Sequence, residues 1–376
     1  MTEHDHAVRL REQAATEDKE EPTTRQDFAS DQQVRWCPGC GDYAVLAALQ
    51  SFLPELEIPR ERFVFVSGIG CSSRLPYYLN TYGIHGIHGR APAIATGLAL
   101  TRPDLDVWVV TGDGDALSIG GNHLIHALPR NVKVKILLLN NEVYGLTKGQ
   151  FSPTSRLGMV TKSAPYGTID WPFNPVSLAL GAEATFVART LYSDRRDIIG
   201  TLRAAARHQG SSFVEIYQDC PVFNDGAFDP LTSKGGRARN WIPLRHRERI
   251  VFGERDELGV VLENGSAHVV EIGEVGIDRI AVHDAHREDP SVAFALSRLS
   301  HTPNGPTPMG IFRSVERPTY DRLMGQQIAA AQARMGPGDL RRLLSSGDTW
   351  VAPDRRGGDR SELSGPRRRS SNGGRP

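Results

Sequence analysis

The feature that most constrains the fold is a series of short apolar runs that alternate with helical segments between residues 31 and 225. Each run is a nearly continuous row of Val, Ile, Leu and Phe, which is typical of strands in a parallel sheet covered on both faces. The runs lie at residues 62–68, 106–112, 132–141, 184–190 and 212–218. Between them, residues 43–53 and 193–210 predict helices, the second with Ser193 or Asp194 as its cap. The sequence therefore predicts an α/β domain with a doubly wound, mostly parallel sheet.

The remainder of the chain divides into three segments of different character. Residues 1–30 and 351–376 are polar and charged, and we expect both to be disordered tails, the second of them basic. Residues 226–350 are only lightly apolar, with a predicted hairpin at 249–265 and a predicted helix at 319–336. We expect this segment to be a C-terminal extension that contacts another subunit.

Charge and hydropathy exclude several classes of protein. The 44 basic and 44 acidic residues cancel, so we expect neither nucleic acid nor an anionic membrane as a partner. No apolar run approaches the roughly 20 residues that a membrane-spanning helix needs, and the charged start is not a secretory signal. With only four cysteines among 376 residues, the chain is expected to be cytoplasmic and to lack a disulfide framework.

Polar residues follow two of the predicted strands. Asp113 lies between two glycines directly after the 106–112 run, and the 132–141 run ends at Asn140 and Asn141. In an open α/β sheet the loops at the carboxyl ends of the strands face the ligand crevice. Glycines let backbone N–H groups approach a phosphate, and a carboxylate with an amide oxygen can hold the Mg²⁺ that bridges phosphates. The sequence thus predicts a magnesium diphosphate site.

This combination resembles the thiamine diphosphate motif, in which Gly-Asp-Gly is followed at this distance by Asn-Asn. The resemblance makes Asp113 and Asn141 the side-chain ligands of Mg²⁺ and gives the backbone carbonyl of Val143 as a third ligand. It also implies a set of residues that line the diphosphate: Gly114, Asp115, Gly145 and Leu146.

The four cysteines suggest a second site. Cys37 and Cys40 form a C-x-x-C pair in "WCPGCGD", while Cys71 and Cys220 each follow a predicted strand at the crevice end of the sheet. Four thiolates suit a [4Fe–4S] cluster, but the spacing alone leaves structural zinc open.

Six stretches, in this order, resemble the β subunit of 2-oxoacid:ferredoxin oxidoreductases. They are "WCPGCGD", "GIGCSSR", "HGRAPAIATGLAL", "TGDGDALSIGGNH", "VYGLTKGQFSPTS" and "QDCPVFND". In that family the four matching cysteines hold a [4Fe–4S] cluster, which favours the cluster over zinc here. The resemblance also implies residues that contact thiamine diphosphate: Ile69, Gly70, Cys71, Ser72, His88, Gly89, Arg90 and Ala91.

The resemblance implies oxidative decarboxylation of a 2-oxoacid with coenzyme A, giving acyl-CoA and CO2, with electrons passing through the cluster to ferredoxin. Thiamine enzymes use an activating glutamate from a second α/β domain, and this sequence predicts only one such domain. We therefore expect an α subunit to complete the site, in an α2β2 assembly.

The substrate is inferred from one residue. Lys148, just beyond the magnesium ligands in "GLTKGQ", is a candidate to hold the second carboxylate of 2-oxoglutarate. A merely solvated lysine is the alternative, with pyruvate or a branched-chain 2-oxoacid as substrate. Two other functions stay open: a non-oxidative thiamine diphosphate enzyme, and a non-catalytic protein stabilised by zinc or a cluster.

Overall fold

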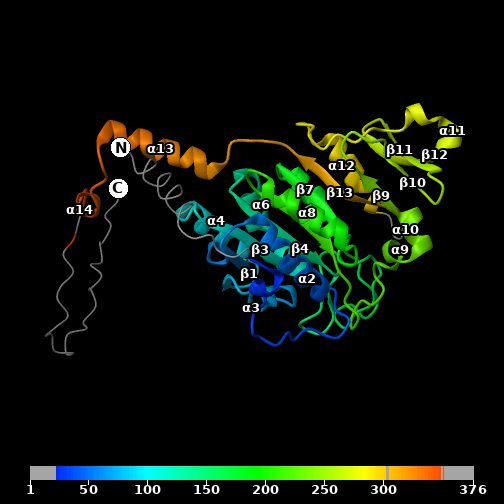
Figure 1. Ribbon diagram of the computed structural model, residues 1–376, viewed down its shortest axis with the longest axis horizontal. Coiled ribbons are helices and arrows are strands. Elements are labelled where there is room, and N and C mark those ends of the chain that lie inside the picture. Colours follow the sequence, from blue (N-terminus) through cyan, green and yellow to red (C-terminus); the bar gives the residue numbers. More distant parts are fainter. Residues whose placement is uncertain (1–22, 302–304, 349, 351–376) are drawn as a thin grey trace, which may run out of the picture. The chain divides into compact units, whose positions relative to one another are not determined.

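The computed structural model describes residues 23–301, 305–348 and 350. Its central element is an eight-stranded sheet with the strand order β2-β1-β3-β4-β8-β7-β13-β9 (Figure 1). The strands from β2 to β7 in this order are all parallel, whereas β13 runs antiparallel to β7 and parallel to β9. The doubly wound, mostly parallel α/β architecture predicted from the sequence is confirmed.

Each apolar run predicted as a strand forms one. The bounds of the sheet are β1 (Phe63–Ser67), β2 (Tyr82–His85), β3 (Asp106–Gly112), β4 (Val134–Asn140), β7 (Phe186–Leu191), β8 (Ser212–Tyr217), β9 (Trp241–Leu244) and β13 (Thr307–Ser314). Strand β2 was not predicted, because its four residues lie at the sheet edge and are mostly exposed.

Alternate strand residues build two cores, one on each face of the sheet. Phe63 and Phe65 of β1 pack into the core that includes α2 (Asp42–Phe52) and α8 (Arg195–Arg207). Val64 and Val66 of the same strand pack into the opposite core. The helices on that second face are α4 (Ala91–Thr101), α6 (Gly121–Arg130), α7 (Pro175–Gly181) and α12 (Ser291–Ser297). Both faces are buried, which is why these strands carry so few polar residues.

The helices predicted at residues 43–53 and 193–210 both form. The carboxylate of Asp194 accepts hydrogen bonds from the backbone N–H groups of Arg196 and Asp197, so Asp194 caps α8. The other predicted helix, residues 43–53, is α2.

The segment after residue 226 is more closely integrated than we expected. It supplies β9 and β13 to the main sheet, and a separate antiparallel sheet of β10 (Val251–Phe252), β11 (Leu258–Glu263) and β12 (Ser266–Glu271), which contains the predicted hairpin. The remaining helices are α3 (Leu75–Tyr78), α5 (Asp113–Leu117), α9 (Asp229–Thr232), α10 (Lys234–Asn240), α11 (Ile272–Val275), α13 (Tyr320–Met335) and α14 (Leu340–Leu344).

The limits of the fold also differ from the predicted segments. The first turn, at Arg25–Phe28, precedes the predicted boundary at residue 31, and its Phe28 is fully buried against Phe63. Near the other end, the chain divides into two compact units between Gly325 and Gln326, within α13. Residues 1–22 and 351–376, most of the two predicted tails, lie outside the described residues.

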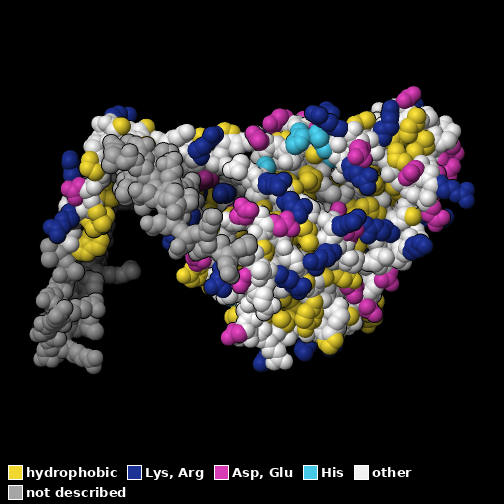
Figure 2. Space-filling view, viewed as in Figure 1, with side chains coloured by type: hydrophobic (Ala, Val, Ile, Leu, Met, Phe, Trp, Pro, Cys, Tyr) yellow, Lys and Arg dark blue, Asp and Glu magenta, His cyan; other side chains and the backbone are white. Residues whose placement is uncertain are grey.

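The surface matches the balanced composition. Lys and Arg side chains are interspersed with Asp and Glu over the face shown in Figure 2. Within the described ranges, no helix is long and apolar enough to cross a membrane.

One buried histidine ties stability to pH. His208 bonds through Nε2 to the hydroxyl of Thr185 at 2.8 Å, and burial together with the charge of Lys135 lowers the pKa of His208 to about 4. In the unfolded chain this histidine binds a proton near pH 6.5, whereas in the folded chain it does so only near pH 4. The free energy of unfolding should therefore fall by about 3 kcal/mol as the pH drops from about 6.5 to about 4. Urea unfolding across this range should show a shallower pH dependence for His208→Gln than for the wild type. An equal slope in the two proteins would contradict the assignment.

Candidate active site

Loops at the carboxyl ends of the parallel strands enclose a cavity of about 530 Å³. Its walls come from the segments after β1, β2, β3, β4 and β8, the edge at which an open α/β sheet binds its ligands. The predicted site residues that line it are Ile69, Gly70, Cys71, Ser72, His88, Asp113, Gly114, Asp115, Asn141, Val143, Gly145 and Leu146. The structure therefore brings the predicted cofactor residues to one place.

Some predicted residues lie outside this lining. Gly89 and Arg90 lead into α4, which begins at Ala91. Lys148 is exposed, in the turn between β5 (Val143–Tyr144) and β6 (Gln150–Phe151), whereas its neighbour Thr147 does line the cavity. Lys148 is thus close to the cavity but does not form its wall.

Asp113 is held in a defined orientation. It is the first residue of α5 and only 3% exposed, and its Oδ2 accepts hydrogen bonds from Ser152 Oγ at 2.5 Å and Thr154 Oγ1 at 2.6 Å. Burial raises the pKa of Asp113 to about 6, while these two hydroxyls lower it. A buried carboxylate in this setting suits a bound cation, which would offset the cost of its charge.

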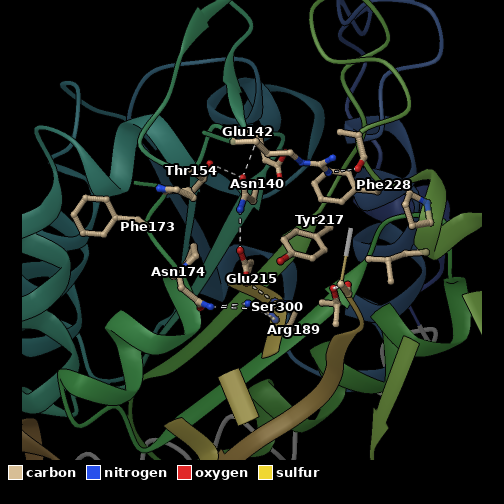
Figure 3. A pocket seen from close by; sticks show the side chains of 18 of the residues that line it. Asn140, Glu142, Thr154, Phe173, Asn174, Arg189, Glu215, Tyr217, Phe228 and Ser300 are labelled. Atoms are coloured by element: carbon tan, nitrogen blue, oxygen red, sulfur yellow. Dashed lines mark hydrogen bonds and ion pairs between the residues drawn. The ribbon is translucent and has the colours of Figure 1, made fainter. Parts of the chain in front are cut away.

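The two asparagines at the end of β4 point in different directions. Asn140 donates through Nδ2 to Glu215 Oε1 at 2.8 Å and lines a separate pocket (Figure 3). Asn141 lines the same cavity as Asp113, and its Oδ1 accepts from the N–H of Val143 at 3.2 Å. Of the two asparagines, Asn141 is the one that lines the same cavity as Asp113.

Asp115 is engaged by the protein itself. Its Oδ1 accepts from His88 Nδ1 at 2.5 Å and from the N–H groups of Gly89 and Ile69, and its Oδ2 accepts from Thr111 Oγ1 at 2.7 Å. We expected Asp115 to line the diphosphate. It does line the cavity, and its carboxylate joins the surrounding loops.

The four thiols gather next to this cavity. Burial raises the pKa of Cys71 to about 12, with the nearby charges of Asp42, Cys220 and Cys37 adding to the effect. Burial likewise raises the pKa of Cys40, and the thiols of Cys71 and Cys220 raise it further. Each of the four thiols therefore lies within electrostatic range of others, as a shared site requires.

Hydrogen bonds connect the cysteine-bearing loops. Trp36 donates through Nε1 to the carbonyl of Cys71 at 2.7 Å, and Gly41 N–H donates to the carbonyl of Asp219 at 3.0 Å. Asn224, in the turn after Cys220, donates to the carbonyl of Asn141 at 2.9 Å. The thiol group and the Asn141 loop therefore form one connected structure.

Several residues of this site were not predicted. Ser152 and Thr154 lie in "FSPTS", Tyr144 donates to the carbonyl of Gly114 at 3.0 Å, and Gln218 lines the cavity although it is 1% exposed. The signal in the sequence was the row of hydroxyl residues in "FSPTS", which otherwise has the composition of a turn.

The comparisons agree with this geometry. Residues 68–216 match the family model described as thiamine pyrophosphate enzyme, C-terminal TPP binding domain. The 2-oxoglutarate oxidoreductase subunit KorB of Mycobacterium tuberculosis is 60% identical over 344 residues, which cover 91% of this chain and 92% of that one. The β subunit of the 2-oxoacid:ferredoxin oxidoreductase of Saccharolobus solfataricus is 36% identical over 61% of this chain and 81% of its own.

One solved structure is similar to this chain over nearly the whole length of the solved chain. It is a 2-oxoglutarate:ferredoxin oxidoreductase from Magnetococcus marinus, solved with 2-oxoglutarate, coenzyme A and succinyl-CoA bound. The TM-score is 0.68 at 33% identity, over 88% of this chain and 98% of that chain. Fold and site thus define a thiamine pyrophosphate-binding subunit of an enzyme. The chain belongs to the β subunits of the 2-oxoacid:ferredoxin oxidoreductases.

Gly68 provides a test of the loop arrangement. A Cβ atom at this position would lie 2.0 Å from Asp115 Oδ2, which cannot move without losing its hydrogen bonds. We expect Gly68→Ala to cost about 1–3 kcal/mol of stability and to weaken thiamine diphosphate binding, as measured by thermal melting and calorimetric titration. Gly97→Ala in α4 is the control, because nothing lies within 4 Å of its Cβ. The control should melt at the wild-type temperature or above it, and equal behaviour of the two variants would contradict the arrangement.

Proposed function

We propose that this chain is the β subunit of a cytoplasmic 2-oxoglutarate:ferredoxin oxidoreductase, which converts the 2-oxoacid and coenzyme A to acyl-CoA and CO2 and passes the electrons to ferredoxin. One observation carries the proposal: the residues suited to magnesium diphosphate and the four thiols meet at one edge of the sheet. A Cβ atom on Gly145 would lie 3.6 Å from the Sγ atoms of both Cys71 and Cys220, and Gly145 also lines the cavity.

The relatives support 2-oxoglutarate as the substrate. The M. tuberculosis relative is named a 2-oxoglutarate oxidoreductase subunit, and the M. marinus structure holds 2-oxoglutarate, coenzyme A and succinyl-CoA. Pyruvate or a branched-chain 2-oxoacid is the alternative substrate, since the S. solfataricus relative is named only for 2-oxoacids.

The residues present fit thiamine diphosphate with Mg²⁺. Asp113 and Asn141 offer a carboxylate and an amide oxygen in one cavity, and the carbonyl of Val143 is the third ligand that the motif implies. When bound, thiamine diphosphate would supply the carbanion chemistry that decarboxylation of a 2-oxoacid requires. The chain's own residues position this cofactor: Asp115 orders the loops around it, and Tyr144 joins the Gly114 loop to the Asn141 loop.

We propose a [4Fe–4S] cluster rather than zinc at the four thiols, because the family that the chain belongs to has a cluster at the matching cysteines. Zinc needs its ligands within about 2.3 Å of one ion, whereas a cubane cluster spreads four thiolates over separate iron atoms. All four cysteines are free thiols, the state expected in the reducing cytoplasm.

An α subunit, in an α2β2 assembly, is proposed to complete the site and supply the activating glutamate. The rim of the cavity exposes apolar side chains, including Ile69 and Leu146, and Ile87 beside His88 is 75% exposed. The segment 157–173 reaches the cavity through Ser163 and exposes further apolar residues, with Ile169 88% exposed. Apolar surface around an open cofactor site is characteristic of a subunit interface. The leucines of α14 are exposed, so the C-terminal extension is a second candidate for contact with the α subunit.

Two variants test the two cofactor sites independently. In the complex purified anaerobically with its α subunit, Cys220→Ser should lose the visible absorbance and the iron of the cluster but keep thiamine diphosphate binding. Asp113→Asn should show the reverse, because it removes a magnesium ligand and leaves the thiols intact. Both variants should lose nearly all 2-oxoglutarate-dependent reduction of an artificial acceptor. The proposal would be refuted if the wild-type protein contained zinc in place of iron, or if the wild-type complex oxidised none of the 2-oxoacids tested.

Lys148 tests the choice of substrate. If its ammonium holds the second carboxylate of 2-oxoglutarate, Lys148→Ala should lower kcat/KM for 2-oxoglutarate by about tenfold, or about 1.4 kcal/mol, mainly through KM. The value for pyruvate, which lacks that carboxylate, should stay unchanged. Lys148→Arg keeps the charge and should fall between the two. If the wild type and Lys148→Ala prefer 2-oxoglutarate over pyruvate to the same degree, Lys148 does not have the role assigned to it.

A further inference from the structure

The turn after β6 buries three hydroxyl side chains within four residues. Ser152, Thr154 and Ser155, on either side of Pro153, are each no more than 5% exposed. A buried hydroxyl without a partner costs free energy, so the partners of these three indicate what the turn is for.

Two of the hydroxyls converge on a single oxygen atom. Ser152 Oγ and Thr154 Oγ1 lie 2.5 and 2.6 Å from Oδ2 of Asp113, although they are 39 and 41 residues from it in sequence. Thr154 Oγ1 is also 3.0 Å from Asn140 Oδ1. Its single proton goes to the carboxylate, since a hydrogen bond to a charged acceptor is the stronger one. Both hydroxyls therefore hold the same oxygen of the Asp113 carboxylate.

The same turn is fixed to the loop that carries Asn141. Ser155 Oγ accepts from the N–H of Ser152 at 2.8 Å and donates to the carbonyl of Glu142 at 2.6 Å. The position of Asp113 relative to the Asn140–Val143 loop is therefore set by one short turn.

The far side of this arrangement is anchored in the core. Asn140 donates to Glu215, whose other oxygen accepts from Arg189 Nε at 2.6 Å, and this chain of contacts is visible in Figure 3. Arg189 and Glu215 are both fully buried in the sheet. Asn140, whose Oδ1 also contacts the Thr154 hydroxyl, is therefore held in place.

We propose that Ser152 and Thr154 are positioning residues for the divalent cation that holds the cofactor's diphosphate, an inference that rests on the proposed function. They hold the Asp113 carboxylate in one orientation by bonding to its Oδ2. Hydroxyls suit this task because they orient a carboxylate without neutralising it, whereas a Lys or Arg in their place would compete with the metal. Residues that orient a ligand in this way commonly contribute 10–100-fold to metal affinity.

Cation affinity is the direct measurement. In the complex with its α subunit, with thiamine diphosphate present, Mn²⁺ binding is followed by the electron paramagnetic resonance signal of the free ion. We expect Ser152→Ala and Thr154→Val each to weaken Mn²⁺ binding about tenfold. Thr154→Ser keeps the hydroxyl and should restore the wild-type affinity. Activity of the variants should recover at high Mg²⁺. The Mg²⁺ concentration that gives half-maximal activity should therefore change more than kcat does.

Thr168→Val is the matched control. Thr168 is also 5% exposed and lines a separate pocket together with Ser152, but its hydroxyl donates to the carbonyl of Arg156 at 2.7 Å. Its removal should leave Mn²⁺ affinity unchanged. Thermal melting identifies any variant that fails to fold, and the smaller changes Ser152→Ala and Thr154→Ser carry the test if Thr154→Val is one of these.

The outcomes separate this inference from the proposed function. If the wild type binds Mn²⁺ with thiamine diphosphate and Ser152→Ala and Thr154→Val bind it equally well, the positioning role is overturned. If these variants bind it more weakly but the wild type oxidises no 2-oxoacid, the proposed function fails and the positioning role stands. A wild type that binds no Mn²⁺ in the presence of thiamine diphosphate overturns both.

Discussion

The cofactor cavity depends on one buried carboxylate, that of Asp115. It accepts hydrogen bonds from the N–H groups of Ile69 and Gly89 and from the side chains of His88 and Thr111, and so joins the segments that follow β1, β2 and β3. Each donor left without an acceptor would cost about 1–3 kcal/mol. The wall of the cavity thus takes its shape from an anion that belongs to the protein, and the ligand need not order these loops.

Asp113 and Asp115 show how helix geometry separates two roles. They lie two residues apart in the first turn of α5, so their side chains leave the helix about 200° apart. Asp115 turns to the loops beyond β1 and β2, and Asp113 turns to Ser152 and Thr154. One carboxylate builds the site, and the other is available to a cation within it.

The sequence predicted the central strands because both of their faces are buried, so their apolar runs stand out. It did not predict β13, whose "TPMGIFRS" contains Pro and Gly and is buried only through pairing with β7 and the distant β9. The predicted ligands gather in one cavity because strand ends of a parallel sheet share an edge. The contacts of Ser152 and Thr154 were not predictable, since they join positions far apart in sequence and a Ser-rich turn looks like any loop. The different directions of Asn140 and Asn141 depend on Glu215, a residue of another strand.

Gly145 explains why the thiol group and the cofactor cavity cannot be treated as separate features. A side chain there would lie 3.6 Å from the sulfur atoms of Cys71 and Cys220 and 4.0 Å from Nδ2 of Asn141. The proposed cluster and the proposed magnesium site are therefore divided by little more than one glycine backbone. This closeness suits the proposed role of the cluster as an electron acceptor, which would require a short path from the cofactor. The hydrogen bond from Asn224 to the carbonyl of Asn141 joins the turn that carries Cys220 to the loop of the cavity that carries Asn141.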